Sequence, residues 1–256
     1  MIPNLTIGAN TISAYMLCTM IGVLVAGTVT IHNAKGKDTL VLTTVLLWAA
    51  PGVVVGSHVL YAITNLSELV LAIQQGCGIR RIIAFFGGSV FYGGLIGGWI
   101  SARLYCRFAH IDPAEYVDDA AVFIPLFHCF GRIGCFLSGC CYGIECPIGF
   151  IYRYSLIESA NFVPRFPIQL VEALGNLLLF FMLYKAYNNA RCIGNLLAVY
   201  GVSYSVLRFT TEFFRGDAYR GFLFSLSTSQ LISMGIGCVS AMVLLYRRRT
   251  RVTGNE

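Results

Sequence analysis

Charged residues are scarce in this sequence. Only 12% of its 256 residues are Asp, Glu, Lys or Arg, whereas 57% are hydrophobic. Soluble domains carry about a quarter charged residues, so the scarcity excludes that class and predicts a polytopic membrane protein. The chain also has no internal repeat, no low-complexity run and no linker long enough to separate two domains. We therefore expect one bundle, a single domain covering residues 1–256.

Two further features are missing. The sequence has no basic face of the kind that binds nucleic acid, because its basic residues are scattered among short loops and gathered in one tail, despite a formal net charge of +6. We interpret these charges as topology signals and expect no nucleic-acid partner. Residues 1–9 also lack the basic region and cleavage site of a signal peptide, so the first apolar segment is expected to stay as a membrane helix.

Long apolar stretches are abundant instead. A helix that crosses a bilayer needs about 20 mostly apolar residues, and seven stretches meet that need. They predict an all-α polytopic fold with seven transmembrane helices. The expected spans are Thr11–Ile31, Leu40–Ile63, Ala84–Tyr105, Val117–Gly139, Ile168–Tyr187, Ile193–Phe213 and Phe224–Tyr246.

The distribution of Lys and Arg predicts the orientation. Cytoplasmic loops are enriched in these residues. One set of alternate loops, together with the C-terminal tail, carries ten of them, and the opposite set carries six. The bias places the C-terminus in the cytoplasm and, with seven spans, the N-terminus outside. The loop from Cys140 to Pro167 then lies outside, where it is expected to cover a site at the outer leaflet.

An arginine lies inside the fourth apolar stretch. A charge in a membrane span is costly, so Arg132 is expected to face the protein interior or a wet cavity and to have a partner. Gly131 and Gly134 flank it and allow a helix or a lipid headgroup to approach the backbone. His128 lies four residues earlier on the same helical face. Both a catalytic base and a core histidine bonded to a backbone carbonyl are open interpretations of His128.

Other polar groups lie in the third and fifth spans. Tyr92 precedes Gly93 and Gly94, and a hydroxyl at that depth seeks a polar partner. Close helix packing is the alternative explanation for the glycines. Gln169 and Glu172 share a face at the start of the fifth span, where a site or a plain helix start explains them equally well.

The sixth span ends in a charged stripe. Residues three and four apart share a helical face, so Arg208, Glu212 and Arg215 point the same way. An ion pair between Arg208 and Glu212 is the structural explanation. Two arginines that converge within a bundle also suit a phosphate, because guanidinium groups match phosphate oxygens and stay charged. In a membrane, a phospholipid headgroup supplies that phosphate.

Several ordered motifs together resemble one family. The matching segments are Gly56 and Tyr61, Tyr92-Gly-Gly-Leu-Ile-Gly97, Gly131-Arg-Ile-Gly with Phe136 and Gly143, Pro167 with Gln169 and Glu172, and Arg208-Phe with Glu212-Phe-Phe-Arg215. They cover nearly the whole chain and resemble the prolipoprotein diacylglyceryl transferases of the bacterial inner membrane. The resemblance implies a seven-helix enzyme that moves the diacylglyceryl group of phosphatidylglycerol to the thiol of a lipobox cysteine, leaving glycerol phosphate. It implies phosphatidylglycerol, a prolipoprotein lipobox peptide and membrane lipids as partners.

The resemblance also implies roles for individual residues. Arg132 and Arg208 would hold the lipid phosphate, Glu212 would orient Arg208, and Tyr92 or His128 would accept the proton of the attacking thiol. The chain departs from the family pattern at four positions: Tyr92 replaces a histidine, Cys135 an asparagine, Cys140 an acidic residue and His58 an arginine. The expected substrate-binding residues are Gly93, Gly94, Gly131, Gly134, Gln169, Glu172 and Arg215.

Cysteines cluster beside this site and support alternatives. Cys135, Cys140, Cys141 and Cys146 face the oxidising side in the predicted topology, so a disulfide such as Cys141 with Cys146 is one interpretation. Zinc is disfavoured because the spacing lacks the short pairs of structural zinc sites, and no cofactor or metal is expected. The alternative functions are a membrane thiol oxidoreductase, a paralogue with another donor or acceptor, and a non-catalytic lipid binder or transporter.

Overall fold

The computed structural model describes residues 3–7, 10–34, 37–74, 76, 78, 90–155, 157–189, 194–217, 222–223 and 226–253. Its contacts divide the chain into two compact units. The larger unit comprises residues 1–32 and 117–256, and the smaller unit comprises residues 33–116. Nine of the twelve predicted site residues belong to the larger unit.

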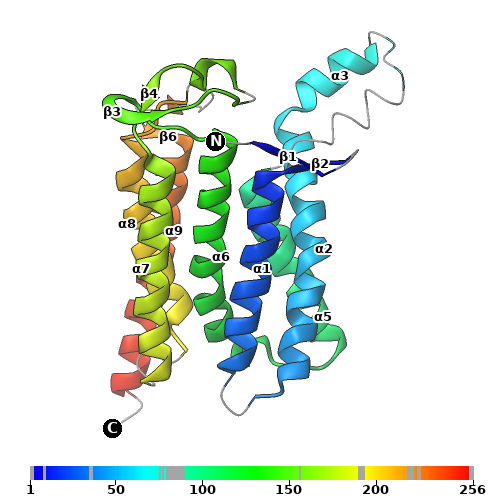
Figure 1. Ribbon diagram of the computed structural model, residues 1–256. Helices are drawn as coiled ribbons and strands as arrows, with labels where there is room; N and C mark the ends of the chain where they lie inside the picture. The colour runs from blue at the N-terminus through cyan, green and yellow to red at the C-terminus, as the bar shows by residue number, and fades with distance from the viewer. Residues whose placement is uncertain are drawn as a thin grey trace. The chain divides into compact units, whose positions relative to one another are not determined.

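The larger unit is a helical bundle. Its helices are α1 (Ala14–His32), α6 (Val117–Ser138), α7 (Ile168–Asn188), α8 (Leu196–Glu212) and α9 (Thr228–Thr253). Helix α6 packs between α1 and α7, and α8 packs against α9 (Figure 1). The apolar core lies between α6, α7 and α8, where Leu126, Leu183 and Leu196 are buried. This arrangement places the polar faces of α6, α7 and α8 toward one another.

Two buried carboxylates fix one end of this bundle. Asp118 in the first turn of α6 accepts hydrogen bonds from the backbone nitrogens of Gly194 and Leu196, so it satisfies the free N–H groups at the start of α8. Asp119 accepts a hydrogen bond of 2.7 Å from the hydroxyl of Tyr187 at the end of α7. The two carboxylates therefore join α6 to α7 and α8 at this end.

The other end of the larger unit carries a folded cap. Strand β3 (Glu145–Ile151) pairs antiparallel with β4 (Pro164–Arg165), and a short helix, η2 (Glu158–Ala160), lies between them in sequence. The cap lies over the end of the bundle where α6 ends and α7 begins (Figure 1). Two further strand pairs occur in this unit. They are β1 (Asn4–Ile7) with β2 (Asn10–Ser13), and β5 (Phe222–Leu223) with β6 (Leu226–Ser227).

Backbone contacts join the cap to the end of α8. The segment around Gly143 forms a bridge with Arg215, and the nitrogen of Gly216 donates to the carbonyl of Tyr142. A Cβ atom at Gly143 would lie 2.3 Å from the carbonyl oxygen of Phe166, so only glycine fits between these chains. The cap is thus held against α8 and the start of α7 by main-chain contacts.

The smaller unit is built on two packed helices. Helix α2 (Thr39–Thr64) and helix α5 (Phe91–Phe108) are accompanied by α3 (Leu66–Gln74) and η1 (Pro113–Glu115). The backbones of α2 and α5 approach so closely that a Cβ atom at Gly93 would lie 2.3 Å from the carbonyl oxygen of Gly56. Small residues permit this close approach. In lipid the hydrophobic effect does not drive helices together, so close packing of this kind stabilises the pair.

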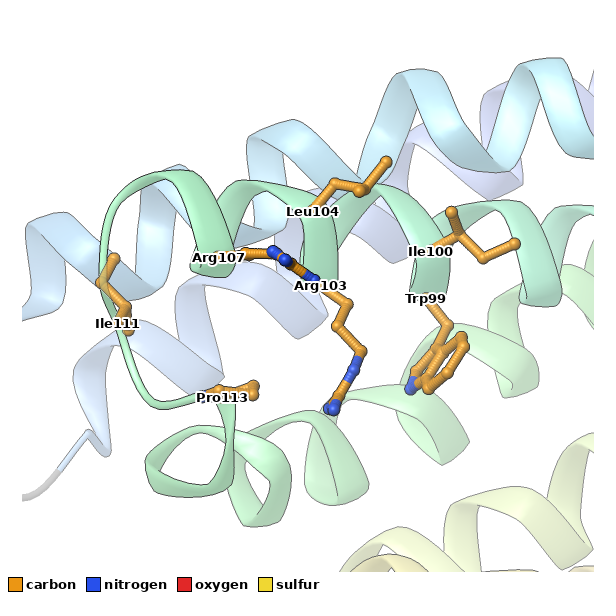
Figure 2. A pocket seen from close by; sticks show the side chains of 7 residues that line it. All are labelled: Trp99, Ile100, Arg103, Leu104, Arg107, Ile111 and Pro113. Carbon is orange, nitrogen blue, oxygen red and sulfur yellow. The ribbon is translucent and has the colours of Figure 1, made fainter.

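A groove lies at the end of α5. Figure 2 shows Arg103 and Arg107 beside the apolar side chains that line it. The guanidinium of Arg103 lies 5.7 Å from the ring centre of Trp99, a cation–π distance. The residues that line the groove are Trp99, Ile100, Arg103, Leu104, Arg107, Ile111 and Pro113. None of them belongs to the predicted site.

The helices confirm a membrane protein. Five helices in the described part of the chain are long and apolar enough to cross a bilayer: α1, α2, α6, α7 and residues Thr228–Thr250 of α9. Their outer faces carry exposed leucines, of which Leu24, Leu178 and Leu245 are more than half exposed. Such faces suit a lipid environment and not water.

The predicted spans match helices with shifted bounds. Helices α5 and α8 have 18 and 17 residues, and both contain charged side chains. The first part of the predicted span Ala84–Tyr105 falls outside the described residues, as does Ile193, the predicted start of the sixth span. Helix α3 and the short strands were not predicted, because apolar run length does not register short elements in loops.

Candidate functional site

Glu172 is the centre of the polar cluster in the larger unit. Its carboxylate, on the second turn of α7, is almost completely buried. The Nε of Arg132 on α6 lies 3.0 Å from Oε2, and an Nη of Arg208 on α8 lies 3.0 Å from Oε1. The hydroxyl of Thr211 also donates to Oε1. Residues of three helices thus meet at one buried carboxylate. They include both arginines that the sequence analysis identified.

Arg208 is fully engaged by its neighbours. The nitrogen that contacts Glu172 also lies 2.6 Å from Glu212, one turn further along α8, and the other Nη donates to Ser229 on α9 at 3.0 Å. The predicted ion pair between Arg208 and Glu212 is therefore present. Glu212 also lies 4.0 Å from Arg215, whose guanidinium binds Asp217 with two hydrogen bonds. These contacts hold Arg208 in a single orientation.

Arg132 is engaged at one nitrogen only. Its Nε faces Glu172, and within the described residues its two terminal nitrogens make no hydrogen bond or ion pair. Its side chain is 13% exposed, against 5% for Arg208. The free part of this guanidinium has the planar, two-donor geometry that binds a carboxylate or a phosphate at two oxygens.

The charges of the cluster balance. Arg132, Arg208 and Arg215 supply three positive charges, and Glu172, Glu212 and Asp217 supply three negative charges. Burying an unpaired charge is costly, so the pairing makes the cluster tolerable inside the bundle. The cluster has no net charge. An anion at the terminal nitrogens of Arg132 would therefore be attracted mainly by the guanidinium of Arg132 itself.

Three sulfur atoms lie beside this cluster. Helix α6 ends in a Schellman motif: Gly139 has a φ of +73°, its nitrogen donates to Phe136, and the nitrogen of Cys140 donates to Cys135. This motif brings the residue after the glycine back to the helix residue five positions earlier, so Cys140 returns to Cys135. Cys141 follows with a φ of +54°. As a result, the sulfurs of Cys135, Cys140 and Cys141 all lie within 4.8 Å of one another.

This sulfur cluster corrects two expectations from the sequence. Cys146 does not belong to it, although it was grouped with the other three. Cys141 and Cys146 are free thiols, so the suggested disulfide between them is not formed. The reason is that Cys146 lies in strand β3 of the cap, whereas the turn that ends α6 keeps Cys141 next to Cys135.

The thiols beyond the end of α6 differ in acidity. Hydrogen bonds from Cys135 and Cys140 hold the pKa of Cys141 well below its usual range, and the charges of Arg132 and Arg215 act in the same direction. For Cys140, a hydrogen bond from Cys135 lowers the pKa. The hydrogen bond to Cys141 and burial outweigh it and raise that pKa to about 12. Cys141 is thus the more acidic of these two thiols.

Gln169 connects the sulfur cluster to the cap. Its side-chain amide is fully buried and donates to the carbonyl of Cys140 at 2.8 Å and to the hydroxyl of Tyr152 at 2.9 Å. Burial raises the pKa of Tyr152 to about 12, so this hydroxyl is neutral. The carbonyl oxygen of Gln169 has no hydrogen-bond donor within the described residues. A buried acceptor of this kind is able to take a donor from a ligand.

His128 lies against aromatic side chains. Its Nδ1 is 3.4 Å from the hydroxyl of Tyr200, and its ring lies 5.0 Å from the ring of Tyr204, both on α8. The imidazole is buried, one turn before Arg132 on α6. These contacts favour the core-histidine interpretation, with tyrosine partners in place of a backbone carbonyl. Its role as a base stays a prediction.

The glycines predicted for the site have different surroundings. A Cβ at Gly134 would lie 3.1 Å from Cys18 on α1, so this glycine permits close packing of α1 against α6. Gly131 has open space beside it, because nothing lies within 4 Å of its Cβ position. Gly93 and Gly94 belong to the smaller unit and face α2. The side chain of Tyr92 lies outside the described residues.

Several residues of the cluster were not predicted. Thr211 and Asp217 lie within nine positions of Arg208, and Thr211 shares a helical face with it at a spacing of three. That spacing is the signal that would have identified it. Ser229 had no such signal, because it lies on α9, and only the packing of α9 against α8 brings it to Arg208.

Comparisons with known proteins agree with these findings. A family model described as prolipoprotein diacylglyceryl transferase matches residues 4–246. A phosphatidylglycerol–prolipoprotein diacylglyceryl transferase of Clostridium tetani is 36% identical over 186 residues, which cover 72% of this chain and 71% of the relative. The corresponding protein of Acidiphilium cryptum is 34% identical over 205 residues, 78% and 73% of the two chains. The second such protein of Clostridium perfringens is 35% identical over 195 residues, 75% and 73%.

Proposed function

Because the chain belongs to the prolipoprotein diacylglyceryl transferase family, we propose that it moves the diacylglyceryl group of phosphatidylglycerol to a lipobox cysteine of a prolipoprotein. The protein is a membrane-embedded transferase. The products are a thioether on the acceptor cysteine and glycerol phosphate. Its partners are the donor lipid, the acceptor peptide and the surrounding membrane lipids.

One observation carries this proposal: Arg132 and Arg208 meet at the carboxylate of Glu172. Glu172 fixes Arg132 through Nε and leaves its two terminal nitrogens for the phosphate. Arg208 neutralises Glu172, so that Arg132 keeps its charge for the ligand, and Glu212 orients Arg208. Arg132 therefore holds the phosphate, while Arg208 acts as a positioning residue.

The chemistry needs a leaving group and a nucleophile. Attack by a thiolate on the glyceryl carbon breaks its bond to the phosphate oxygen, and negative charge develops on that oxygen. A fixed guanidinium at this point stabilises the transition state more than the ground state. The acceptor thiol reacts as its thiolate, so its proton has to be removed. Tyr92 and His128 remain the predicted acceptors of that proton.

Other residues of the cluster have supporting roles. The unpaired carbonyl oxygen of Gln169 accepts a hydrogen bond from the acceptor peptide, and Arg215, held by Asp217, supplies positive charge near the sulfur cluster. Gly131 and Gly134 give the lipid headgroup and α1 access to the backbone of α6. Gly93 and Gly94 contribute from a second segment, as the family resemblance implies.

We place the protein in the bacterial inner membrane as a single domain of seven transmembrane helices. Helices α5 and α8 complete the seven together with the five longer spans. The C-terminus lies in the cytoplasm, because ten of the sixteen Lys and Arg residues in the loops, the adjoining helix ends and the tail fall on that side. The cap over α6 and α7 then faces outward, the side where secreted prolipoproteins arrive.

The substitution Arg132→Lys tests the proposal. Lysine keeps the charge but loses the two-donor fork, so we expect kcat/KM to fall by about 10²- to 10³-fold with little change in the amount of folded protein. The purified protein is incubated with phosphatidylglycerol and a lipobox peptide, and the mass gain of the peptide cysteine is measured. Arg153→Lys, at an exposed position of the cap, is the matched control and should be as active as the wild type.

The same assay separates the alternatives. Full activity of the Arg132→Lys variant would refute its role in holding the phosphate. If the wild type binds phosphatidylglycerol and no lipid product forms with any acceptor, the non-catalytic lipid-binding function is correct. A lipid product search without a chosen donor distinguishes this outcome from the use of another donor or acceptor.

A further inference from the structure

The sulfur cluster has the composition of a metal site. Cys135, Cys140 and Cys141 place three sulfurs within 4.8 Å of one another, and within the described residues no fourth Cys, His, Asp or Glu joins them. Structural zinc sites have four protein ligands, whereas catalytic zinc sites have three and leave one position for a substrate. A site with three protein ligands is therefore of the open, catalytic kind.

The backbone prepares this geometry without a ligand. The Schellman turn at Gly139 returns Cys140 to Cys135, and the left-handed conformation of Cys141 adds the third sulfur. A Cβ at Gly139 would lie 2.7 Å from Ser155, so the turn is also fixed by the cap. Positive φ at a non-glycine residue is energetically unfavourable and is often found at functional sites. The conformation of Cys141 therefore points to a role for its side chain.

We propose that Cys135, Cys140 and Cys141 bind a zinc ion whose fourth position takes the thiolate of the acceptor cysteine. Zinc–sulfur bonds of about 2.3 Å in a tetrahedron place the sulfurs about 3.8 Å apart. The observed sulfurs all lie within 4.8 Å of one another, so no pair exceeds this spacing by more than about 1 Å. Cys140 and Cys141 are only partly buried, which leaves the fourth position accessible.

The surrounding charges suit such a complex. Three thiolates and one zinc ion carry a net charge of −1, which the guanidinium groups of Arg132 and Arg215 attract. The positive environment therefore supports this thiolate site.

The site also lies where the transfer needs a nucleophile. This inference rests on the proposed function. Arg132 and Cys135 are three residues apart on one face of α6, so a phosphate held by Arg132 lies beside the metal. Zinc would lower the pKa of the acceptor thiol on binding, so in this proposal the proton would go to solvent and would not need Tyr92 or His128 as a base. The sulfur then attacks the glyceryl carbon, the carbon–oxygen bond breaks, and the electron pair leaves with glycerol phosphate. No electron donor or acceptor is needed.

Metal content gives the first test. The full-length protein is purified in detergent from cells grown with zinc, and the metal is measured by mass spectrometry. We expect about one zinc ion per chain, and at least about a tenfold loss of occupancy in Cys135→Ser, Cys140→Ser and Cys141→Ser. Cys146→Ser is the matched control and should keep its zinc. Gel filtration verifies that each variant is folded.

Cobalt gives a readout that does not depend on activity. Co²⁺ in the metal-free wild type should show thiolate charge-transfer absorption, and a lipobox peptide should shift its ligand-field bands. The same peptide with serine in place of cysteine should cause no shift. Folded protein that binds neither zinc nor cobalt would overturn the proposal. A stable disulfide between any two of the three cysteines would do so as well.

The transfer assay separates this proposal from the proposed function. If transfer continues at the full rate after a chelator has removed all metal, the zinc site has no role in the reaction and the proposal is wrong, while the transferase function stands. If zinc binds and the peptide thiol coordinates it, but no diacylglyceryl group reaches the peptide from any lipid, the zinc site stands and the transferase function fails.

Discussion

Arg132 and Arg208 have the same side chain but different surroundings. Arg208 contacts two carboxylates and a hydroxyl, whereas Arg132 contacts one carboxylate through Nε alone. A guanidinium with all its partners inside the protein has little capacity left for a ligand. From the sequence we predicted the same role for both arginines, and the structure supports a division between a ligand-binding residue and a positioning residue.

His128 can be tested by a substitution that preserves its shape. His128→Phe keeps a ring against Tyr204 but removes the contact with the hydroxyl of Tyr200. We expect a loss of stability of about 1–3 kcal/mol and an unchanged pH dependence of kcat/KM. Tyr200→Phe, which removes the other partner of the same contact, should behave alike. A fall in kcat of about 10²-fold or more with an altered pH profile would instead identify His128 as the base.

The acidity of Cys141 predicts a pH dependence. Its pKa lies well below the usual range because of the hydrogen bonds from Cys135 and Cys140 and the charges of Arg132 and Arg215. A lowered pKa keeps the thiolate present at lower pH. In metal-free protein, alkylation of Cys141 by iodoacetamide should therefore continue as the pH falls below that range, while alkylation of Cys140, whose pKa is about 12, should not. Peptide mass spectrometry measures both rates, and equal pH profiles would contradict the prediction.

At the scale of elements, helix ends position the chemistry. The end of α6 turns the cysteines back, the start of α7 presents Glu172, and the last turn of α8 presents Arg208. The cap then fixes these ends through main-chain contacts. At the other end, Asp118 satisfies the N–H groups of α8. The site is therefore built by helix ends and the way they are tied together, with few contributions from helix centres.

Gly93 tests the packing of α2 against α5. An added methyl group would meet the backbone of Gly56 at 2.3 Å, and backbone cannot move aside without separating the helices. We expect Gly93→Ala to destabilise the protein by about 1–3 kcal/mol, measured by thermal unfolding in detergent. Gly27→Ala on α1, where nothing lies within 4 Å, is the control and should be neutral or stabilising. An unchanged Gly93→Ala variant with weaker lipid binding would favour the predicted substrate contact.

At the scale of the whole molecule, orientation decides which substrates reach the site. In the proposed function the prolipoprotein arrives from the outer side, so we expect the cap and the sulfur cluster to open there. The cap and the C-terminal end of α9, whose sequence carries the basic tail, lie at opposite ends of the larger unit (Figure 1). An orientation with the tail in the cytoplasm therefore places the cap outside.

Reporter fusions test this orientation. Alkaline phosphatase attached after residue 256 should be inactive, and green fluorescent protein at the same position should fluoresce, because the tail carries four of the ten Lys and Arg residues on the side that we predict to be cytoplasmic. A phosphatase fusion in the loop after Ser155 should be active. The reverse result at both positions would invert the topology and place the site in the cytoplasm.

The membrane class, the approximate positions of the long helices and the ion pair between Arg208 and Glu212 were predictable from the sequence alone. Each of these depends on local properties: the length of an apolar run, or a spacing of four residues on one helix. The sequence also pointed to Arg132, because a charge within an apolar stretch requires a partner.

Only the tertiary structure decided which partners meet. Glu172 joins Arg132 and Arg208 because α6, α7 and α8 pack side by side, and sequence spacing does not encode that distance. The same holds for Ser229 and for the separation of Cys146 from the other cysteines. Contacts between residues far apart in sequence depend on helix packing and on the path of the chain at helix ends. The contacts of the site could therefore be identified only from the tertiary structure.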